Sequence, residues 1–224
     1  MIYNIELVEN HIIFIENDLR LLLDTGSPIS ISNISNISLF GETMNIHNTI
    51  ENKSIDDVNK SILNANIDAL IGADVLSKIS FSISFSNKLM EINPVINYNE
   101  YDSFPLSYFM GVPSMIARLN GKDIKFFLDT GAKISYVNFT LIQGQNIIRV
   151  KEDFYPGFGA FETSIYQIHL ELFKHLKRYE FGVLPESLEL SLNMLGVNGI
   201  IGNNILINFD LVIDNIQNQI LVKK

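Results

Sequence analysis

The sequence contains no cysteine, and charged residues make up only 18% of its 224 residues. Without cysteine, the chain has no disulfide, no thiolate nucleophile and no zinc–cysteine site, and it suits a reducing compartment. The first ten residues contain no basic segment, and no apolar run approaches the roughly 20 residues that span a bilayer. We therefore expect a cytoplasmic protein without a signal peptide or a transmembrane segment.

Positive charge is also scarce, because 16 lysines and arginines face 25 acidic residues and give a formal net charge of −9. This balance argues against nucleic acid or an anionic membrane as the main partner. The sequence has no phosphate-binding glycine loop and no Gly-x-Ser-x-Gly motif. Its four histidines have no spacing typical of a metal site, so we expect neither a metal nor a cofactor.

What the sequence does contain is an internal repeat. Residues 19–30 read LRLLLDTGSPIS and residues 124–135 read IKFFLDTGAKIS, with six of the twelve positions identical. Downstream, ALIGADVL at 69–76 matches GIIGNNIL at 199–206. Each half of the chain is therefore predicted to contain a buried strand, Asp-Thr-Gly, a variable segment, a second apolar strand ending in glycine, a short helix and a hairpin.

The repeat and the turn residues define the expected domains. The apolar fraction of 47% is sufficient for a packed core, and the patterns are mostly those of strands. Two prolines and several turn residues occur in 93–105, which we interpret as a linker. We therefore predict an all-β fold of two related lobes, an N-terminal lobe of residues 1–97 and a C-terminal lobe of residues 98–224.

The paired aspartates, Asp24 and Asp129, indicate a chemistry. If their loops meet at a two-fold axis, the two carboxyl groups approach within hydrogen-bonding distance. Like charges at that distance cannot both ionise cheaply, so the pair shares one proton, and one aspartate is an acid while the other is a base. Such a pair can activate a water molecule to attack a peptide carbonyl.

The residues that follow each aspartate have roles that fit this arrangement. The hydroxyls of Thr25 and Thr130 can hydrogen-bond across the axis to the partner loop. Gly26 and Gly131 are expected to allow a tight turn and to leave room for a substrate.

With DTGS and DTGA each followed by an apolar-apolar-glycine segment, the chain resembles the aspartic peptidases of the pepsin and retroviral types over nearly its whole length. The resemblance implies a single-chain, retropepsin-like enzyme with catalytic Asp24 and Asp129, no covalent intermediate, and an extended peptide as substrate. A monomer would suffice, because both motifs are on one chain. The implied supporting residues are Thr25, Gly26, Ser27, Thr130, Gly131 and Ala132 in the loops and Ile71, Gly72, Ile201 and Gly202 in the segments that buttress them.

The resemblance also implies a β-hairpin flap over the substrate. In the second half, FYPGFGAFET at 154–163 has glycines for a tip and aromatic residues to cover a ligand. Phe158, Gly159 and Phe161 are the candidate flap residues, although these aromatic residues fit an ordinary core equally well. In the first half only residues 40–44 lie in the corresponding region, so that flap is expected to be reduced or missing.

Ser27 and Ala132 differ at the same place in the two motifs. In the resemblance, a serine there can donate a hydrogen bond to its aspartate and stabilise the ionised form. This leads to the hypothesis that Asp24 is the more acidic partner and that Asp129 holds the shared proton.

Two other functions remain open from the sequence. The chain could be an inactive peptide-binding module of the same fold, which a missing first flap would favour. It could also be another hydrolase with two carboxylates, such as a glycosidase, which would need the aspartates several ångströms further apart.

Overall fold

We analysed a computed structural model, which describes residues 1–50, 52–61, 65–155 and 159–224 and is mostly β-strand. Its strands in the first half of the chain are β1 (Ile2–Val8), β2 (His11–Glu16), β3 (Leu19–Leu23), β4 (Ile31–Ser32), β5 (Asn36–Leu39), β6 (Glu42–Asn45), β7 (Ala69–Ile71), β8 (Phe81–Ser84) and β9 (Leu89–Ile92). Those in the second half are β10 (Tyr101–Pro105), β11 (Ser107–Phe109), β12 (Val112–Leu119), β13 (Lys122–Leu128), β14 (Ser135–Val137), β15 (Ile147–Tyr155), β16 (Gly159–Leu172), β17 (His175–Gly182), β18 (Gly199–Ile201), β19 (Leu211–Asp214) and β20 (Gln219–Lys223). The helices are α1 (Ile55–Ser61), α2 (Ala73–Leu76), α3 (Glu186–Met194) and α4 (Asn203–Leu206), with 3-10 turns at Tyr98–Glu100 and Phe139–Leu141.

In the first half, β1, β2 and β3 are antiparallel neighbours, and β3 lies parallel to β7. Leu21–Leu23 pair with Ala69–Ile71, and all six residues are buried. This burial explains why both segments are continuous apolar runs rather than alternating ones. β4 pairs with the other edge of β7. The Asp-Thr-Gly segment is therefore a loop that leaves the sheet after β3 and returns at β4.

The second half repeats this order. β11, β12 and β13 are antiparallel, β13 lies parallel to β18, and β14 pairs with the other edge of β18. The pairing of Phe126–Leu128 with Gly199–Ile201 corresponds residue by residue to that of Leu21–Leu23 with Ala69–Ile71. The two motifs of the sequence thus stand at equivalent places in two equivalent strand arrangements.

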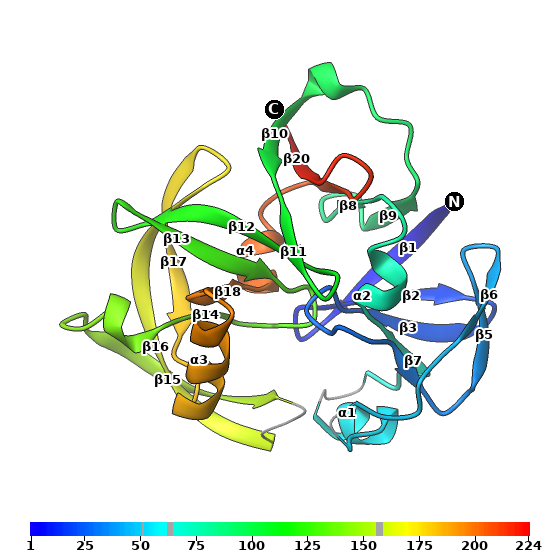
Figure 1. Cartoon of the computed structure of the whole chain (residues 1–224), viewed down its shortest axis with the longest axis horizontal. Coiled ribbons are helices and arrows are strands. Elements are labelled where there is room, and N and C mark those ends of the chain that lie inside the picture. The colour runs from blue at the N-terminus through cyan, green and yellow to red at the C-terminus, as the bar shows by residue number, and fades with distance from the viewer. Residues whose placement is uncertain (51, 62–64, 156–158) are drawn as a thin grey trace.

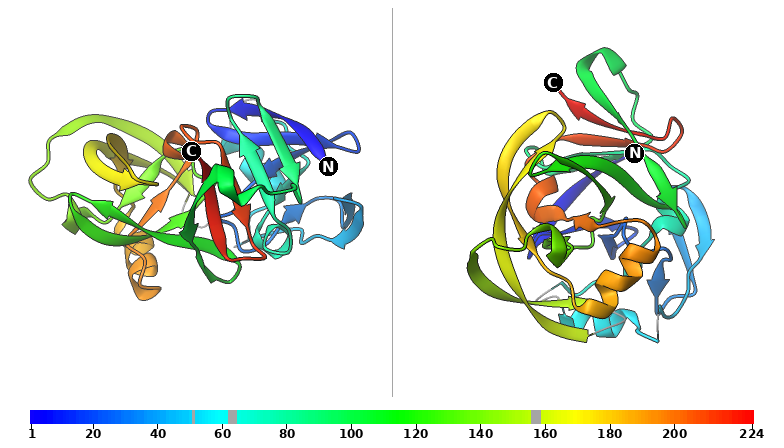
Figure 2. Two further views of the ribbon diagram at one scale, coloured as in Figure 1. Left: turned by 90° about the horizontal axis from the view of Figure 1, so that it is seen from above. Right: turned by 60° about the vertical axis from the view of Figure 1, so that its left-hand side comes forward.

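A larger sheet joins the two halves. β8 and β9 end the first half of the chain, β19 and β20 end the second half, and β8 pairs with β19. The expected linker at 93–105 contains a strand of its own, because β10 pairs with β20 along its whole length. Seen from above in Figure 2, the N-terminal strands (blue) and β15–β17 (yellow) lie toward opposite ends, with the C-terminal strands (red) between them.

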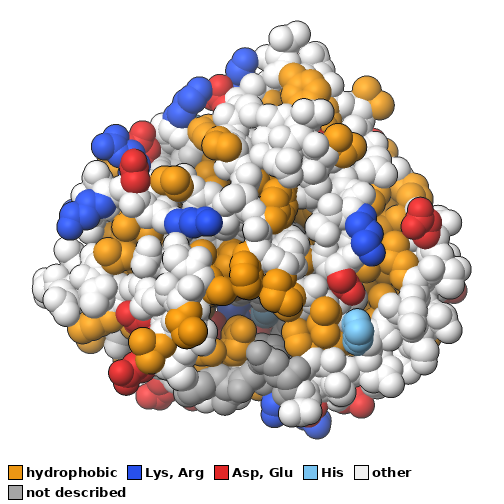
Figure 3. All heavy atoms as spheres, in the orientation of Figure 1, with side chains coloured by type: hydrophobic (Ala, Val, Ile, Leu, Met, Phe, Trp, Pro, Cys, Tyr) orange, Lys and Arg blue, Asp and Glu red, His pale blue; other side chains and the backbone are white. Residues whose placement is uncertain are grey.

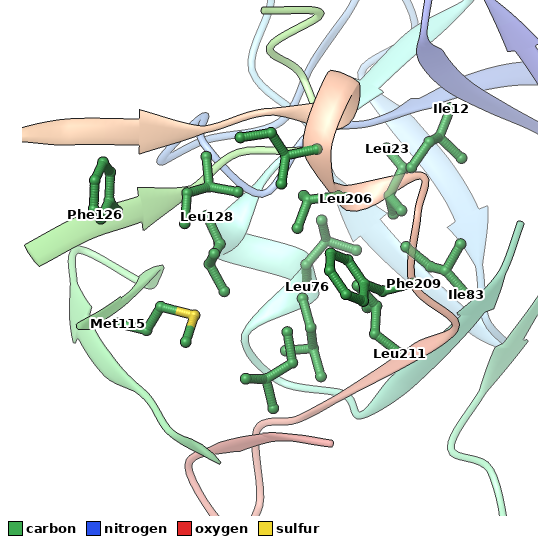
Figure 4. Close-up of a cluster of buried hydrophobic side chains, with 14 of the residues drawn as sticks. Ile12, Leu23, Leu76, Ile83, Met115, Phe126, Leu128, Leu206, Phe209 and Leu211 are labelled. Carbon is green, nitrogen blue, oxygen red and sulfur yellow. The ribbon is translucent and has the colours of Figure 1, made fainter. Parts of the chain in front are cut away.

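The core runs between the two halves without interruption. One cluster of buried residues includes side chains from β2, β3, α2, β13, α4 and β19. Figure 4 shows Leu76 and Leu206, from the two short helices that follow the glycines, beside Leu128 and Phe209. These helices directly follow β7 and β18, the strands beside the two aspartate loops. Packing in this core therefore fixes the loops relative to one another.

The halves differ most in the segment between the Asp-Thr-Gly loop and the strand that lies parallel to β3 or β13, which is β7 in the first half and β18 in the second. In the second half β17 ends parallel to β14, and in the first half His47, just after β6, makes a parallel bridge to Ile31 of β4. This makes β6 the counterpart of β17. The turns before them match, because Phe40 and Phe173 are both buried and have φ values of 54° and 53°.

The assignment of residues 40–44 to the flap region is therefore wrong. They belong to a hairpin whose Phe40 packs against Phe14 and Tyr3. In the second half an additional outer hairpin, formed by residues 147–155 and 159–166 of β15 and β16, precedes the corresponding strand (Figure 1). The part of the first half that the structure describes contains no counterpart of this outer hairpin.

No helix among the described residues combines the length and the apolar character that crossing a membrane requires.

Candidate active site

Each aspartate is held by its own loop in the same way. The Asp24 amide donates to the carbonyl of Ile71 at 3.0 Å, and the amides of Gly26 and Ser27 donate to Oδ1 of Asp24 at 3.0 and 2.9 Å. These contacts leave Oδ2 of Asp24 available for chemistry.

The Asp129 loop repeats these contacts. Its amide donates to the carbonyl of Ile201 at 3.0 Å, and Gly131 and Ala132 donate to Oδ1 of Asp129 at 2.8 and 3.1 Å. Both carboxyls therefore have one oxygen that accepts two backbone hydrogen bonds.

The two threonines connect the loops by a reciprocal exchange. The Thr25 hydroxyl donates to the carbonyl of Leu128 at 2.8 Å and accepts the amide of Thr130 at 3.0 Å. The Thr130 hydroxyl does the same with the carbonyl of Leu23 and the amide of Thr25, at 2.8 and 3.0 Å. These contacts across the halves are those that the sequence predicts. Since both hydroxyls are buried, the loops cannot separate without leaving polar groups unpaired.

The glycines after the threonines allow the two carboxyls to meet. A Cβ atom on Gly26 would lie 2.1 Å from Cγ of Asp129, and one on Gly131 would lie 2.3 Å from Cγ of Asp24. Neither glycine has a positive φ. The sequence-based reason for them is therefore corrected, because each glycine makes room for the opposite carboxyl rather than for an unusual turn.

Gly72 and Gly202 permit a second close approach. A Cβ on Gly72 would lie 2.5 Å from the carbonyl oxygen of Ile29, and one on Gly202 would lie 2.6 Å from that of Ala132. The residues after these glycines donate amide hydrogen bonds of 2.8 Å back to Ser27 and Ala132. The segments with Ile71 and Ile201 thus lie directly against the aspartate loops, as the resemblance implies.

The two carboxyls share a hydrogen bond. Burial raises the pKa of Asp24 well above its ordinary value of 3.8, and the neighbouring charge of Asp129 raises it further. Burial also raises the pKa of Asp129, but backbone hydrogen bonds and the contact with Asp24 oppose the increase. Both pKa values are therefore raised, and the pair titrates as a unit that retains one proton.

The hydroxyl contact on which the hypothesis about Ser27 depends is not made. The hydroxyl of Ser27 donates to the carbonyl of Ile29 at 2.7 Å, so it cannot donate to Asp24 at the same time. Only the backbone amide of Ser27 reaches the carboxylate, and the amide of Ala132 does the same for Asp129. The serine–alanine difference consequently does not distinguish the two aspartates.

A cavity of about 120 Å³ opens over the carboxyls. In Figure 3 the corresponding face is hollowed below its centre, between the positions of α3 and α1 in Figure 1, and hydrophobic side chains line the upper rim. The cavity lining includes residues of the outer hairpin, among them Asp153, Phe154, Tyr155 and Phe161. Of the candidate flap residues, Phe161 therefore faces the cavity, Gly159 begins β16 with a φ of +97°, and Phe158 lies outside the described residues.

Two further cavities adjoin the first, and they differ from one another in chemical character. One of about 190 Å³ also touches Gly26 and Asp129, and apolar side chains from β11, β12 and α3 line it. The other, of about 490 Å³, shares Lys133 and Asp153 with the first and has mostly charged walls. The larger groove of about 960 Å³ on another part of the surface contains neither aspartate.

Four residues of the site do not follow from the motifs: His11, Lys133, Tyr136 and Asp153, all in the cavity lining. A comparison of the two repeats could have identified two of them. Lys133 and Tyr136 are polar residues at positions where the first half has Pro28 and Ile31.

His11 is one of the four histidines whose spacing predicts no metal site. Its Nδ1 lies 3.2 Å from the carbonyl of Val8, and burial lowers its pKa. Within the described residues, no group of three histidine, aspartate or glutamate side chains is placed to hold a metal ion.

No family model and no curated protein sequence matches the chain. Among solved structures, a retropepsin-like aspartic protease from Rickettsia conorii matches with a TM-score of 0.40 and 16% sequence identity. The match covers 55% of this chain and 93% of that chain. At this distance the likeness concerns the fold alone, and the chemistry of the site has to be inferred from its own residues.

Proposed function

We propose that the chain is a hydrolase that uses a proton-sharing pair of carboxyls, and more particularly a single-chain aspartic endopeptidase. The observation that carries this proposal is the reciprocal packing of each carboxyl against the glycine of the other loop. Two aspartates with raised pKa values in a cavity, on a rigid hydrogen-bonded base, fit acid–base chemistry better than a structural role.

The proposed reaction begins with a water molecule between the carboxyls. One aspartate of the pair, as the carboxylate, takes a proton from the water while the water oxygen attacks the peptide carbonyl, and the other aspartate donates its proton to the carbonyl oxygen. When the resulting tetrahedral diol collapses, the C–N bond breaks. The proton on the first aspartate then passes to the leaving amine, and the second aspartate recovers a proton from the diol. The pair returns to its starting state without a covalent intermediate.

The fold supports a two-lobed arrangement as part of this proposal. Lobes of residues 1–97 and 98–224 would each contribute one aspartate loop, and an extended peptide would lie in the cleft between them. Both loops belong to one chain, so a monomer suffices for the active site. A cytoplasmic location is a further part of the proposal.

The two ends of the cleft favour different substrate side chains. The cavity of about 190 Å³ beside Asp129 is apolar and can take a large apolar side chain. The charged walls of the other cavity favour a polar residue on the opposite side of the scissile bond.

Neither alternative function fits the geometry as well. Carboxyl pairs of glycosidases are separated by roughly 5–9.5 Å, whereas Asp24 and Asp129 share a hydrogen bond. An inactive peptide-binding module has no need to keep two desolvated carboxyls in contact, because their repulsion destabilises the fold without contributing to binding.

The proposal is tested by incubating the purified chain with a peptide library at several pH values and identifying products by mass spectrometry. The wild type is expected to cleave, and Asp24→Asn and Asp129→Asn should each reduce cleavage by at least about a thousandfold, since the residues act as a unit. Asp74→Asn serves as a control, because Asp74 lies on α2 outside the cavity. Equal cleavage by the wild type and both variants would refute the peptidase function, and peptide binding without any cleavage would identify the binding module.

A further inference from the structure

The outer hairpin is attached to the loop beneath it through one carboxylate. Asp153 of β15 accepts a hydrogen bond from the Tyr136 hydroxyl, and its Oδ1 lies 3.3 Å from Nζ of Lys133. The side chain of Asp153 is only 10% exposed, and that of Lys133 is 22% exposed. A charge-assisted contact with this degree of burial is stronger than one on an open surface.

These contacts connect the hairpin to the Asp129 loop. Lys133 is the second residue after Gly131, and Tyr136 lies in β14, the strand to which the loop returns. The Tyr136 ring also lies 6.2 Å from that of Phe161, which belongs to the other strand of the hairpin. Both strands of the outer hairpin therefore contact the same tyrosine.

The parts of this connection occur only in the half that has an outer hairpin. The first half has Pro28 and Ile31 at the positions of Lys133 and Tyr136. Neither side chain can donate a hydrogen bond or carry a charge. If Tyr136 and Lys133 served only the packing of the loop, the first half, whose loop has the same backbone contacts, would need equivalents.

We propose that Asp153 is a positioning residue for peptide hydrolysis, which holds the outer hairpin over the aspartate pair through Tyr136 and Lys133. These contacts then hold the cavity wall formed by Phe154, Tyr155 and Phe161 in a fixed position relative to Asp24 and Asp129. This inference rests on the proposed peptidase function. A substrate enclosed by this wall is oriented against the water before reaction, and such positioning affects the chemical step as well as binding.

Asp153 also acts on the site through its charge. The negative charge of Asp153 raises the pKa of Asp129 and opposes the lowering of the pKa of His11 by burial. Among the described residues, the charged and titratable groups around Asp153 are Lys133, Tyr136, His11 and Asp129, with Glu9 reaching Lys133 at 4.0 Å. The cavity that Asp153 lines with Lys133 also contains Lys53, Asp57, Lys60 and Glu152. Removing the charge should therefore move the pH profile of hydrolysis, which a purely structural contact would not do.

The test compares Asp153→Asn and Tyr136→Phe with the wild type in peptide hydrolysis. Each change is expected to lower kcat/KM by about tenfold, with part of the loss in kcat. The double variant should lose little more than either single one, because both changes break the same connection. In Asp153→Asn alone, the acidic limb of the pH profile should also shift to lower pH, because the pKa of Asp129 falls and the carboxylate that the aspartate pair needs then forms at lower pH.

Glu162→Gln is the matched control, because Glu162 lies in β16, the other strand of the outer hairpin, carries the same charge, is exposed and lines none of the three cavities beside the aspartates. It should leave kcat/KM and the pH profile within about twofold of the wild type. Asp153→Glu retains the charge and should recover part of the activity and the wild-type pH profile.

Hydrogen exchange separates this inference from the proposed function, since it needs no substrate. The amides of β15 should exchange at least about tenfold faster in Asp153→Asn and Tyr136→Phe than in Glu162→Gln. Wild-type exchange and kinetics in both variants would overturn the role of Asp153 while leaving the peptidase proposal intact. Faster exchange combined with unchanged kcat/KM and pH profile would also overturn it, because the hairpin would then be held without effect on the reaction. An inactive wild type would instead refute the proposed function.

Discussion

The loops that hold Asp24 and Asp129 have matching backbone contacts, but the chain segments around them differ. Both loops use two amides on one carboxylate oxygen, a threonine exchange and a glycine in contact with the opposite carboxyl. Within the part of the chain that the structure describes, the second half alone adds the outer hairpin and the polar residues beneath it. We infer from this comparison that the proposed chemistry requires two aspartate loops, whereas one outer hairpin is sufficient for both aspartates.

The largest effect is expected where the halves are most alike. Gly26→Ala and Gly131→Ala each place a Cβ within 2.4 Å of the opposite carboxyl, so the carboxyls must separate. Each change should lower peptide hydrolysis by at least about a hundredfold, which initial rates on one cleaved peptide would measure.

The control for these variants is Gly144→Ala, whose Cβ would have no atom within 4 Å although its φ of +84° adds strain. It should destabilise the fold by about 1 kcal/mol without changing the rate per folded molecule. An alanine variant at Gly26 or Gly131 that keeps wild-type activity would show that close approach of the carboxyls is not required.

A smaller effect is expected where the halves differ beside the loops. Asn203 follows the second buttress glycine, and its buried amide donates at 2.6 Å to the carbonyls of Thr130 and Asn10. In the first half the same place is Ala73, whose Cβ would lie 3.1 Å from a Cβ on Gly111. Asn203→Ala should destabilise the fold by about 1–3 kcal/mol and lower the thermal midpoint by several degrees.

The reciprocal change, Ala73→Asn, adds atoms where Gly111 leaves no room, so it should destabilise by a similar amount through overpacking. Calorimetry of both variants tests whether the two sites are specialised. Two unchanged midpoints would mean that these positions are interchangeable and that the difference between the halves has no energetic basis here.

The aspartate pair should also affect stability as a function of pH. Because the folded state raises both pKa values above 3.8, it binds more protons than the unfolded state once the pH exceeds that value. The pair's contribution to stability is therefore retained below about pH 3.8 and is lost as the pH rises toward the folded pKa values.

Asp129→Asn removes this penalty and should stabilise the fold at pH 7 by about 1 kcal/mol or more, raising the midpoint by about 2–4 °C. The difference from the wild type should disappear near pH 3. Thermal unfolding at both pH values measures it, and a variant that is less stable than the wild type at pH 7 would contradict the raised pKa values.

The smallest effect is expected at the position after each glycine. Ser27→Ala and Ala132→Ser exchange the residues of the two halves, but the Ser27 hydroxyl donates to Ile29 rather than to Asp24. Ser27→Ala should cost about 0.5–1.5 kcal/mol of stability and leave the pH profile of hydrolysis unchanged. A shift of the acidic limb on Ser27→Ala would restore the original hypothesis about this serine.

The sequence was sufficient to predict the parts of the fold that depend on local pattern. Continuous apolar runs ending in Asp-Thr-Gly predicted strands buried on both faces, and β3 and β13 have that environment. The repeat also predicted the threonine exchange, because a hydroxyl at a fixed offset from each aspartate has an equivalent partner across the axis.

The remaining features depend on contacts between residues far apart in the chain, and periodicity contains no information on them. Tyr136 meets Asp153 only because the outer hairpin folds back over β14. The acceptor of the Ser27 hydroxyl depends on the backbone path after the loop, which brings the carbonyl of Ile29 to 2.7 Å. Likewise, residues 40–44 contain the glycine of a flap tip, but their hairpin is the counterpart of the turn at Phe173.

The shared proton can be observed directly by carboxyl-carbon NMR on a chain labelled at aspartate, with Asp24→Asn and Asp129→Asn used to assign the two signals. We expect the pair to titrate as a coupled unit, with at least one step well above 3.8. Removal of Asp129 should bring the pKa of Asp24 back toward its ordinary value. Two independent titrations near 3.8, each unaffected by the loss of the other aspartate, would contradict the proposed proton-sharing pair.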